Sequence, residues 1–145
     1  MPVEIEWTIN LPVPPEKLFE IATKYEDYVN YLPAQIKKIT ILEDSNDRTV
    51  TEETLSFMTI LKKEIIQKSV HRKKPNTITT EIISGPFKNS NVVVNFVENN
   101  DGSKVEIKAD LAIPMKYKIF GLVIRKVYKN YLTSILYKMV NQIQM

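Results

Sequence analysis

The chain has 145 residues, of which 43% are hydrophobic and 26% charged, and it contains no cysteine. This length and composition exclude a disordered chain and predict one globular domain over residues 1–145. The lack of cysteine excludes disulfides and thiol chemistry. Because the N-terminus also shows no signal peptide, we expect a cytoplasmic location.

The charge is distributed unevenly along the chain. The net charge is +3, but residues 111–145 hold six basic residues and no acidic one. Such a segment can attract phosphate or anionic lipid, and the same pattern also suits the solvent side of a packed helix. No stretch is long and apolar enough to predict a transmembrane helix.

The N-terminal part predicts one strand followed by two short helices. Apolar and polar residues alternate over residues 3–11, which is typical of a strand with one face in water. Prolines end this strand, and Pro15 is a favoured first residue of a helix, so we expect a helix over residues 15–23. A second helical piece is expected over about 25–31, ending before Pro33.

Six further strands are predicted before residue 114, separated by turn residues such as N-N-D-G at 99–102. The expected strands are 36–42, 50–60, 65–71, 78–83, 92–97 and 105–113. Strands joined by tight turns pair antiparallel, and the apolar face of such a sheet must be covered by another element.

The C-terminal segment predicts that covering helix. Apolar residues recur every three or four positions from Phe120 to Ile143, and the helix is expected to begin at Gly121 or just before it. Four residues are expected together on its opposite, solvent side: Lys126, Lys129, Asn130 and Thr133.

This order of elements resembles the START-like, helix-grip (SRPBCC) superfamily over the whole chain. Three stretches resemble its polyketide cyclase and coenzyme Q-binding branch: V-P-P-E-K-L-F-E-I-A at 13–22, Y-E-D-Y-V-N-Y-L-P at 25–33 and G-P-F-K at 85–88. The resemblance implies an α+β fold in which a curved seven-stranded antiparallel sheet wraps around a long C-terminal helix, with two short helices after the first strand. The run at 89–96 lacks the tryptophan that follows GPF in quinone-binding relatives, so no particular ligand is implied.

The same resemblance implies a cavity between sheet and helix that binds a hydrophobic or amphipathic molecule. The expected function is that of a carrier or chaperone for a lipid, an isoprenoid or a quinone-like compound, without a cofactor. The expected cavity wall is Trp7, Leu55, Phe57, Ile82, Phe87, Val94, Phe96, Ile107, Leu111, Phe120, Ile124, Val127 and Tyr131. The expected rim is Lys116, Tyr117, Lys118 and Arg125, which would face an anionic membrane surface or an acidic head group.

Catalytic and metal-binding patterns are weak in this sequence. A single histidine without cysteine argues against a zinc site, and three scattered glycines argue against a phosphate-binding loop. His71 is interpreted as a solvated loop histidine, and the carboxylates at 81, 106 and 110 are expected to face water.

Two alternative functions remain open at this point. The first is a polyketide cyclase or dehydratase that acts in the same cavity with polar groups such as Thr80, Asn95 or the tyrosines at 117, 128 and 131. The second is a ribosome- or RNA-associated protein that uses a basic surface formed by residues 71–74 and 116–129. The sequence gives no indication of oligomeric state.

Overall fold

A computed structural model describes residues 2–57 and 64–144 of the protein. The chain begins with β1 (Pro2–Leu11), α1 (Pro15–Ala22), the 3₁₀ helix η1 (Tyr25–Asp27) and α2 (Tyr28–Tyr31). Six strands follow: β2 (Ile36–Asp44), β3 (Arg48–Ser56), β4 (Glu64–Lys74), β5 (Thr77–Ser84), β6 (Asn91–Asn99) and β7 (Gly102–Ala112). The 3₁₀ helix η2 (Met115–Phe120) and the long α3 (Gly121–Gln144) complete the described chain.

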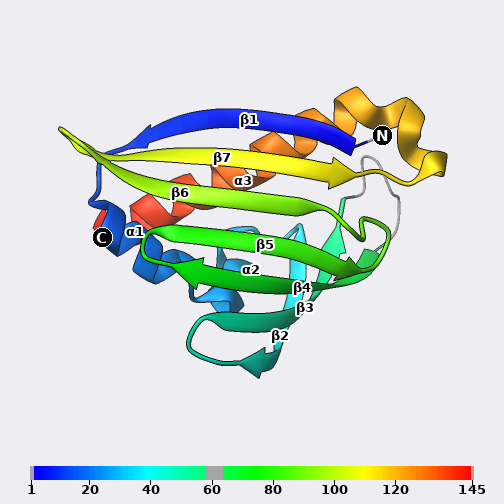
Figure 1. Ribbon diagram of the computed structural model, residues 1–145, viewed down its shortest axis with the longest axis horizontal. Coiled ribbons are helices and arrows are strands. Elements are labelled where there is room, and N and C mark those ends of the chain that lie inside the picture. The colour runs from blue at the N-terminus through cyan, green and yellow to red at the C-terminus, as the bar shows by residue number, and fades with distance from the viewer. Residues whose placement is uncertain (1, 58–63, 145) are drawn as a thin grey trace.

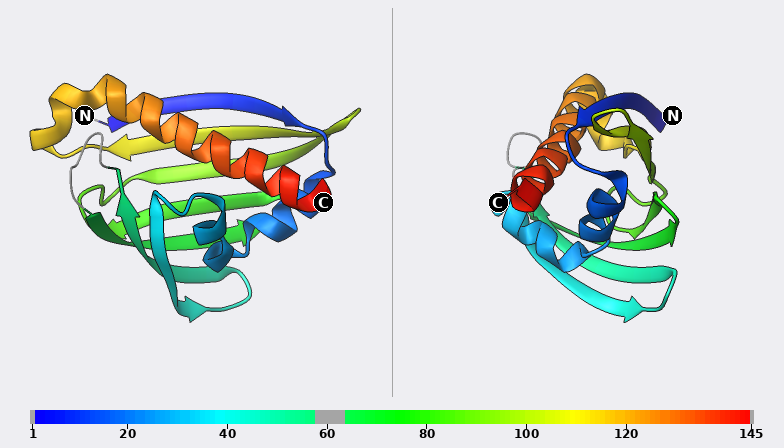
Figure 2. Two further views of the ribbon diagram at one scale, coloured as in Figure 1. Left: turned by 180° about the vertical axis from the view of Figure 1, so that it is seen from behind. Right: turned by 90° about the vertical axis from the view of Figure 1, so that its left-hand side faces the viewer.

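The seven strands form one antiparallel sheet in the order β1-β7-β6-β5-β4-β3-β2. The sheet curves around α3, which runs diagonally across its concave face (Figure 1 and Figure 2). Register shifts at Ile36/Lys38, Ile41/Glu43 and Lys68/Ser69 mark bulges, which bend strands and increase their twist. This confirms the predicted α+β fold with two short helical pieces after the first strand.

The two ends of the sheet differ in what covers them. At one end, α1, η1 and α2 pack beneath the sheet, and α3 ends beside them (Figure 2). At the other end lie the β5–β6 connection and η2, which projects past the ends of β1 and β7 (Figure 1). We call these the closed end and the mouth end.

The predicted boundaries of two strands, β3 and β4, are wrong in instructive ways. The strand expected at 50–60 begins at Arg48 and ends at Ser56, while positions 58–60 lie outside the described residues. The strand expected to end at His71 continues to Lys74, because β4 pairs with β5 up to Lys74 and Thr77. The turn between them needs only Pro75 and Asn76, whose φ of 57° is tolerated by asparagine. His71 therefore lies inside the sheet.

The packing of α3 also corrects two expectations. Thr133 does not face solvent: its hydroxyl oxygen accepts a hydrogen bond of 3.2 Å from the Nε1–H of Trp7 on β1. At the N-terminal end of the apolar face predicted for this helix, Phe120 and Val123 are 39% and 48% exposed. They lie in the segment that projects beyond the sheet, so the apolar periodicity continues past the surface that could cover it.

Candidate functional site

A cavity of about 190 Å³ lies between the concave face of the sheet and α3. Its walls come from strands β2–β7, from α3 and from the short helices at the closed end, and most of the side chains are aliphatic or aromatic. Among the described residues that line it there is no lysine or arginine, and Glu53 is the one carboxylate. The cavity thus combines a large apolar surface with a small polar part.

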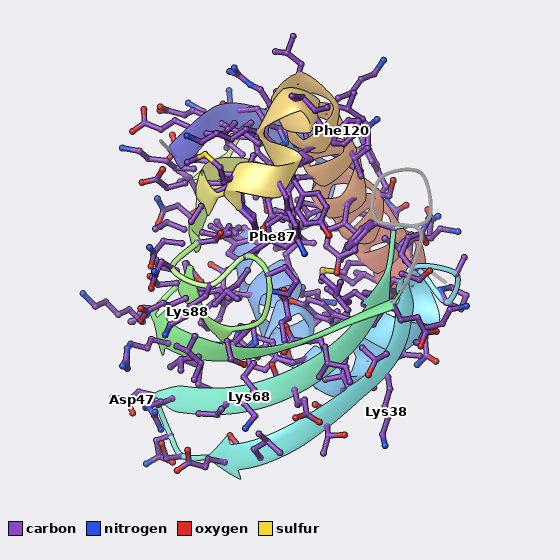
Figure 3. The ribbon with its side chains drawn as sticks, turned by 90° about the vertical axis from the view of Figure 1, so that its right-hand side faces the viewer. Lys38, Asp47, Lys68, Phe87, Lys88 and Phe120 are labelled. Atoms are coloured by element: carbon purple, nitrogen blue, oxygen red, sulfur yellow. The ribbon has the colours of Figure 1, made fainter. Side chains whose placement is uncertain are left out.

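Most of the predicted wall residues surround this cavity. Eleven of the thirteen line it: Leu55, Phe57, Ile82, Phe87, Val94, Phe96, Ile107, Leu111, Ile124, Val127 and Tyr131. Trp7 does not, because its indole packs between β1 and α3 and hydrogen-bonds Thr133. Phe120 does not either, because it lies on the projecting η2 (Figure 3).

The polar part of the cavity centres on Glu53 of β3. Its Oε1 atom accepts hydrogen bonds from Ser69 Oγ at 2.7 Å and Gln67 Nε2 at 3.2 Å, and its Oε2 atom accepts one from Thr51 Oγ1 at 2.6 Å. Burial raises the pKa of the Glu53 carboxyl, and the three hydrogen bonds oppose this effect because they favour the ionised form. The result is a buried acid without a cationic partner among the described residues of the cavity.

His71 of β4 extends this cluster toward the closed end. Its Nε2 atom lies 2.9 Å from Thr51 Oγ1, and its Nδ1 atom lies 2.8 Å from Thr80 Oγ1 on β5. When Thr51 donates to Glu53, it accepts from the Nε2–H of His71, and the Nδ1 atom then accepts from Thr80. A continuous hydrogen-bonded chain therefore joins Thr80, His71, Thr51 and Glu53.

His71 is held neutral by its surroundings. The ring of Tyr25 from η1 stacks on it with centroids 4.1 Å apart and planes 16° apart. Burial lowers the pKa of His71 from 6.5 to about 4, so the imidazole carries no charge at neutral pH. This contradicts the interpretation of His71 as a solvated loop residue.

Two tyrosines of α3 face the polar cluster from the other side of the cavity. Tyr128 and Tyr131 both line it, and their ring centroids are 6.1 Å apart. Burial raises the pKa of both phenols, and the nearby charge of Glu53 raises them further. Tyr117, the third predicted tyrosine, does not line the cavity. Of the other two polar candidates, Thr80 lines it, whereas Asn95 instead accepts a hydrogen bond from Thr77.

The mouth end brings aromatic side chains together. Phe87, on the β5–β6 connection, lies at the centre of the view into this end (Figure 3), and its ring centroid is 6.4 Å from that of Tyr117 on η2. The predicted rim residues Lys116, Lys118 and Arg125 are exposed here, and the Lys116 ammonium lies 5.1 Å from the Tyr117 ring centroid. None of the four predicted rim residues lines the cavity itself.

The predicted site residues do not include the polar cluster around Glu53, although strand alternation indicates its position. Side chains alternate between the two faces of a strand, so Thr51 and Glu53 must point the same way as the predicted wall residue Leu55. The register then places Gln67 opposite Glu53, and Ser69 opposite Thr51. The inward direction of Glu53 was thus available from the sequence, whereas its partners were not.

Neither a metal centre nor a membrane-spanning helix is found within residues 2–57 and 64–144. No group of three or more histidine, cysteine or carboxylate side chains in this range is placed to hold a metal ion. No helix in the same range is long and apolar enough to cross a membrane.

Comparisons with known proteins agree with this architecture. The family model described as polyketide cyclase / dehydrase and lipid transport matches residues 2–144. A search of curated proteins finds no match.

Three solved structures illustrate the similarity of fold. TTHA0849 from Thermus thermophilus has a TM-score of 0.82 at 16% identity, covering 98% of this chain and 97% of that one. The Zhui aromatase/cyclase from Streptomyces sp. R1128 has a TM-score of 0.81 at 11% identity, covering 98% and 93%. A START superfamily protein from Mycobacterium smegmatis has a TM-score of 0.78 at 15% identity, covering 97% of both chains. Identities this low speak for the fold alone. The family match, which covers almost the whole chain, shows that this chain belongs to the polyketide cyclase / dehydrase and lipid transport family.

Proposed function

We propose that this protein binds a hydrophobic or amphipathic small molecule in the cavity and acts as its carrier or chaperone. The observation that carries the proposal is an apolar cavity between sheet and α3 whose polar groups are gathered around Glu53. Ligand sites are typically of this kind, with mostly apolar walls and a few polar groups that orient the ligand. Lipids, isoprenoids and quinone-like compounds all have the required apolar part.

The size of the cavity limits how much of such a ligand it can enclose. At about 190 Å³ the cavity is comparable to one that accepts a single aromatic ring, and it is smaller than the pockets of drug-sized ligands, which span roughly 300–1,000 Å³. A longer ligand would place its polar group near Glu53 and extend its tail toward Phe87 and the mouth end. Separation of the rings of Phe87 and Tyr117 would widen this route.

Native mass spectrometry of the purified protein, followed by organic extraction, tests the carrier proposal. We expect a discrete adduct that is released on denaturation and whose extract contains an apolar compound. A substitution in the cavity wall, Val127→Trp, should lower the adduct fraction, because the indole is much larger than the valine side chain and would fill part of the cavity. A bare protein that also fails to bind any apolar probe would contradict the proposal.

A membrane surface is the proposed place of ligand exchange. Four apolar side chains at the mouth end, Met115, Ile119, Leu122 and Val123, are 79%, 87%, 82% and 48% exposed. Four basic residues, Lys116, Lys118, Arg125 and Lys126, alternate with them, and no acidic residue follows Asp110. We call these eight residues the mouth patch. Exposed apolar side chains with interspersed positive charge are complementary to an anionic bilayer.

A second candidate function is supported by the chain of hydrogen bonds from Thr80 to Glu53. General acid–base catalysis requires a positioned acid or base, and Glu53 and His71 provide such groups in the cavity. The protein would then act on a carbonyl compound in the manner of a cyclase or dehydratase. This candidate uses the same cavity as the carrier, but the bound molecule is a substrate that is converted into a product.

Proton exchange at carbon distinguishes the enzyme from the carrier. β-Tetralone, a compact aromatic ketone, would be incubated with the protein in deuterium oxide, and deuterium incorporation beside the carbonyl would be followed by mass spectrometry. An enzyme gives incorporation above the buffer rate that is lost in Glu53→Gln. Equal rates with and without the protein would contradict the enzymatic candidate and leave the carrier proposal intact.

The ribosome or RNA alternative gains no support from the arrangement of basic residues. Residues 71–74 lie at the closed end, where β4 turns into β5, whereas η2 and the start of α3 lie at the mouth end (Figure 1). His71 itself faces the cavity. The two basic segments therefore do not form the continuous face on which that alternative depended.

A further inference from the structure

The unpaired carboxylate in the cavity leads to an inference about ligand chemistry, which rests on the proposed function. We propose that the ligand carries an uncharged hydroxyl group, alcoholic or phenolic, that lies between Glu53 and the tyrosines of α3, and that Glu53 excludes ligands with an anionic head group. The inference deepens the binding proposal, because it names the polar group that the cavity selects.

The first step is the hydrogen-bonding capacity left on Glu53. A carboxylate offers about four acceptor positions. The side chains of Thr51, Gln67 and Ser69 occupy three of them. Because Glu53 lines the cavity, the remaining position is open to a ligand that donates a hydrogen bond.

The second step concerns the opposite wall. Tyr28 and Tyr31 donate their hydroxyl hydrogens to Ala22 O and Gln142 Oε1. Tyr128 and Tyr131 line the cavity. In the described part of the chain, neither hydroxyl donates a hydrogen bond to another residue. These two phenols can therefore donate to a ligand oxygen. A hydroxyl group satisfies both walls at once, since it donates to Glu53 and accepts from a tyrosine.

The third step is charge. The described residues that line the cavity include no lysine or arginine, and His71 is neutral at physiological pH. At a pH above the raised pKa of Glu53, a ligand carboxylate would meet the ionised Glu53 side chain in a poorly solvated space without a cation to separate them, and like charges repel strongly there. Fatty acids and other anionic amphiphiles should therefore bind poorly.

Competition against a neutral naphthylamine dye tests the inference. The competitors are decanol, decyl methyl ether and decanoic acid, which share one tail and differ in the head group, in mildly alkaline buffer. The proteins are the wild type, Glu53→Gln and Glu52→Gln. Glu52 is the matched control, because it precedes Glu53 on the same strand, pairs with Lys68 and does not line the cavity.

We expect decanol to bind the wild type and Glu52→Gln about tenfold more tightly than decanoate, and more tightly than the ether, which cannot donate. In Glu53→Gln the gap between decanol and decanoate should shrink to about threefold or less, because the charge is gone. Tyr128→Phe should weaken decanol about three- to tenfold, which provides a second test if Glu53→Gln does not fold.

Two outcomes would overturn the inference for different reasons. Decanoate binding as tightly as decanol in the wild type, or a gap that persists in folded Glu53→Gln, would show that Glu53 does not select the head group while the cavity still binds apolar ligands. Failure of the dye and all three competitors to bind would overturn the proposed function itself, and the inference with it.

Discussion

The ring of Tyr25 lies flat against the imidazole of His71, with 4.1 Å between their centroids. Tyr25 belongs to η1 and His71 to β4, so this contact joins the short helices to the concave face of the sheet. It covers His71 within the hydrogen-bonded chain that leads from Thr80 to Glu53. Tyr25 therefore closes this end of the cavity and keeps water away from His71. The same burial keeps the imidazole neutral.

The low pKa of His71 predicts a particular pH dependence of stability. The pKa is about 4 in the folded chain and near 6.5 in the unfolded chain. Between these values the unfolded chain binds more protons, so the free energy of unfolding falls as the pH drops from 6.5 to about 4. The loss from this residue approaches about 3 kcal/mol, because each unit of pKa corresponds to about 1.4 kcal/mol.

Urea unfolding of wild type and His71→Gln at several pH values measures this effect. Other groups titrate in both proteins, including Glu53, whose raised pKa acts in the opposite sense, so the difference between the two curves isolates His71. The chain has a single histidine, so its ring proton can also be followed directly by NMR. A ring that titrates near its ordinary value of 6.5 would show that the Tyr25 contact does not exclude water.

The fold was predictable because its signals are local and repeated. Alternation identified β1 and β7, and turn residues such as those at 99–102 separated the strands. The end of β4 was missed, because pairing with β5 continues through lysines whose own preferences suggest a turn. Apolar periodicity likewise cannot show where the sheet beneath α3 stops, so Phe120 was placed in the wall.

The polar part of the site was harder to predict than the apolar part. Aromatic and aliphatic residues at inward strand positions identify a wall without knowledge of their neighbours. The importance of Glu53 depends on Gln67 and Ser69, which are distant in sequence and become its partners only through the β3–β4 register. Strand alternation indicates the direction of the Glu53 side chain, but only the register reveals its chemistry.

Gly85 is predicted to be essential for the packing of the β5–β6 connection. Its φ is +104°, and a Cβ atom there would lie 2.9 Å from both Gln67 Cβ and the Ile66 backbone oxygen. Gly85→Ala should therefore lower the free energy of unfolding by about 1–3 kcal/mol. The matched control is Gly121→Ala, because a Cβ there meets no atom within 4 Å and alanine favours the helix. If both variants unfold at the same urea concentration, the close approach of Gly85 to Ile66 and Gln67 does not determine stability.

Trp7 should matter for stability and not for ligand binding. Its indole hydrogen-bonds Thr133 at 3.2 Å and does not line the cavity. Trp7→Phe removes this bond and part of the contact between β1 and α3, so we expect a loss of about 1–3 kcal/mol by circular dichroism. Affinity for a neutral naphthylamine dye should stay within about twofold. Phe87→Ala, at the mouth end, should show the reverse pattern, and a large loss of dye affinity in Trp7→Phe would place the tryptophan back in the site.

The mouth patch predicts binding to anionic membranes. Vesicles of phosphatidylglycerol and phosphatidylcholine should retain the protein in a flotation experiment, whereas vesicles of phosphatidylcholine alone should not, because each lysine or arginine at an anionic surface contributes about 1 kcal/mol. The double variant Ile119→Ser, Leu122→Ser should weaken retention about tenfold or more without loss of stability, since both side chains are more than 80% exposed. Leu42→Ser is the control, because Leu42 is 45% exposed on β2, at the opposite edge of the sheet. Equal retention of all proteins would contradict the membrane proposal. Loss of self-association in the double variant, without any vesicle binding by the wild type, would instead identify a second copy of the chain as the partner of the mouth patch.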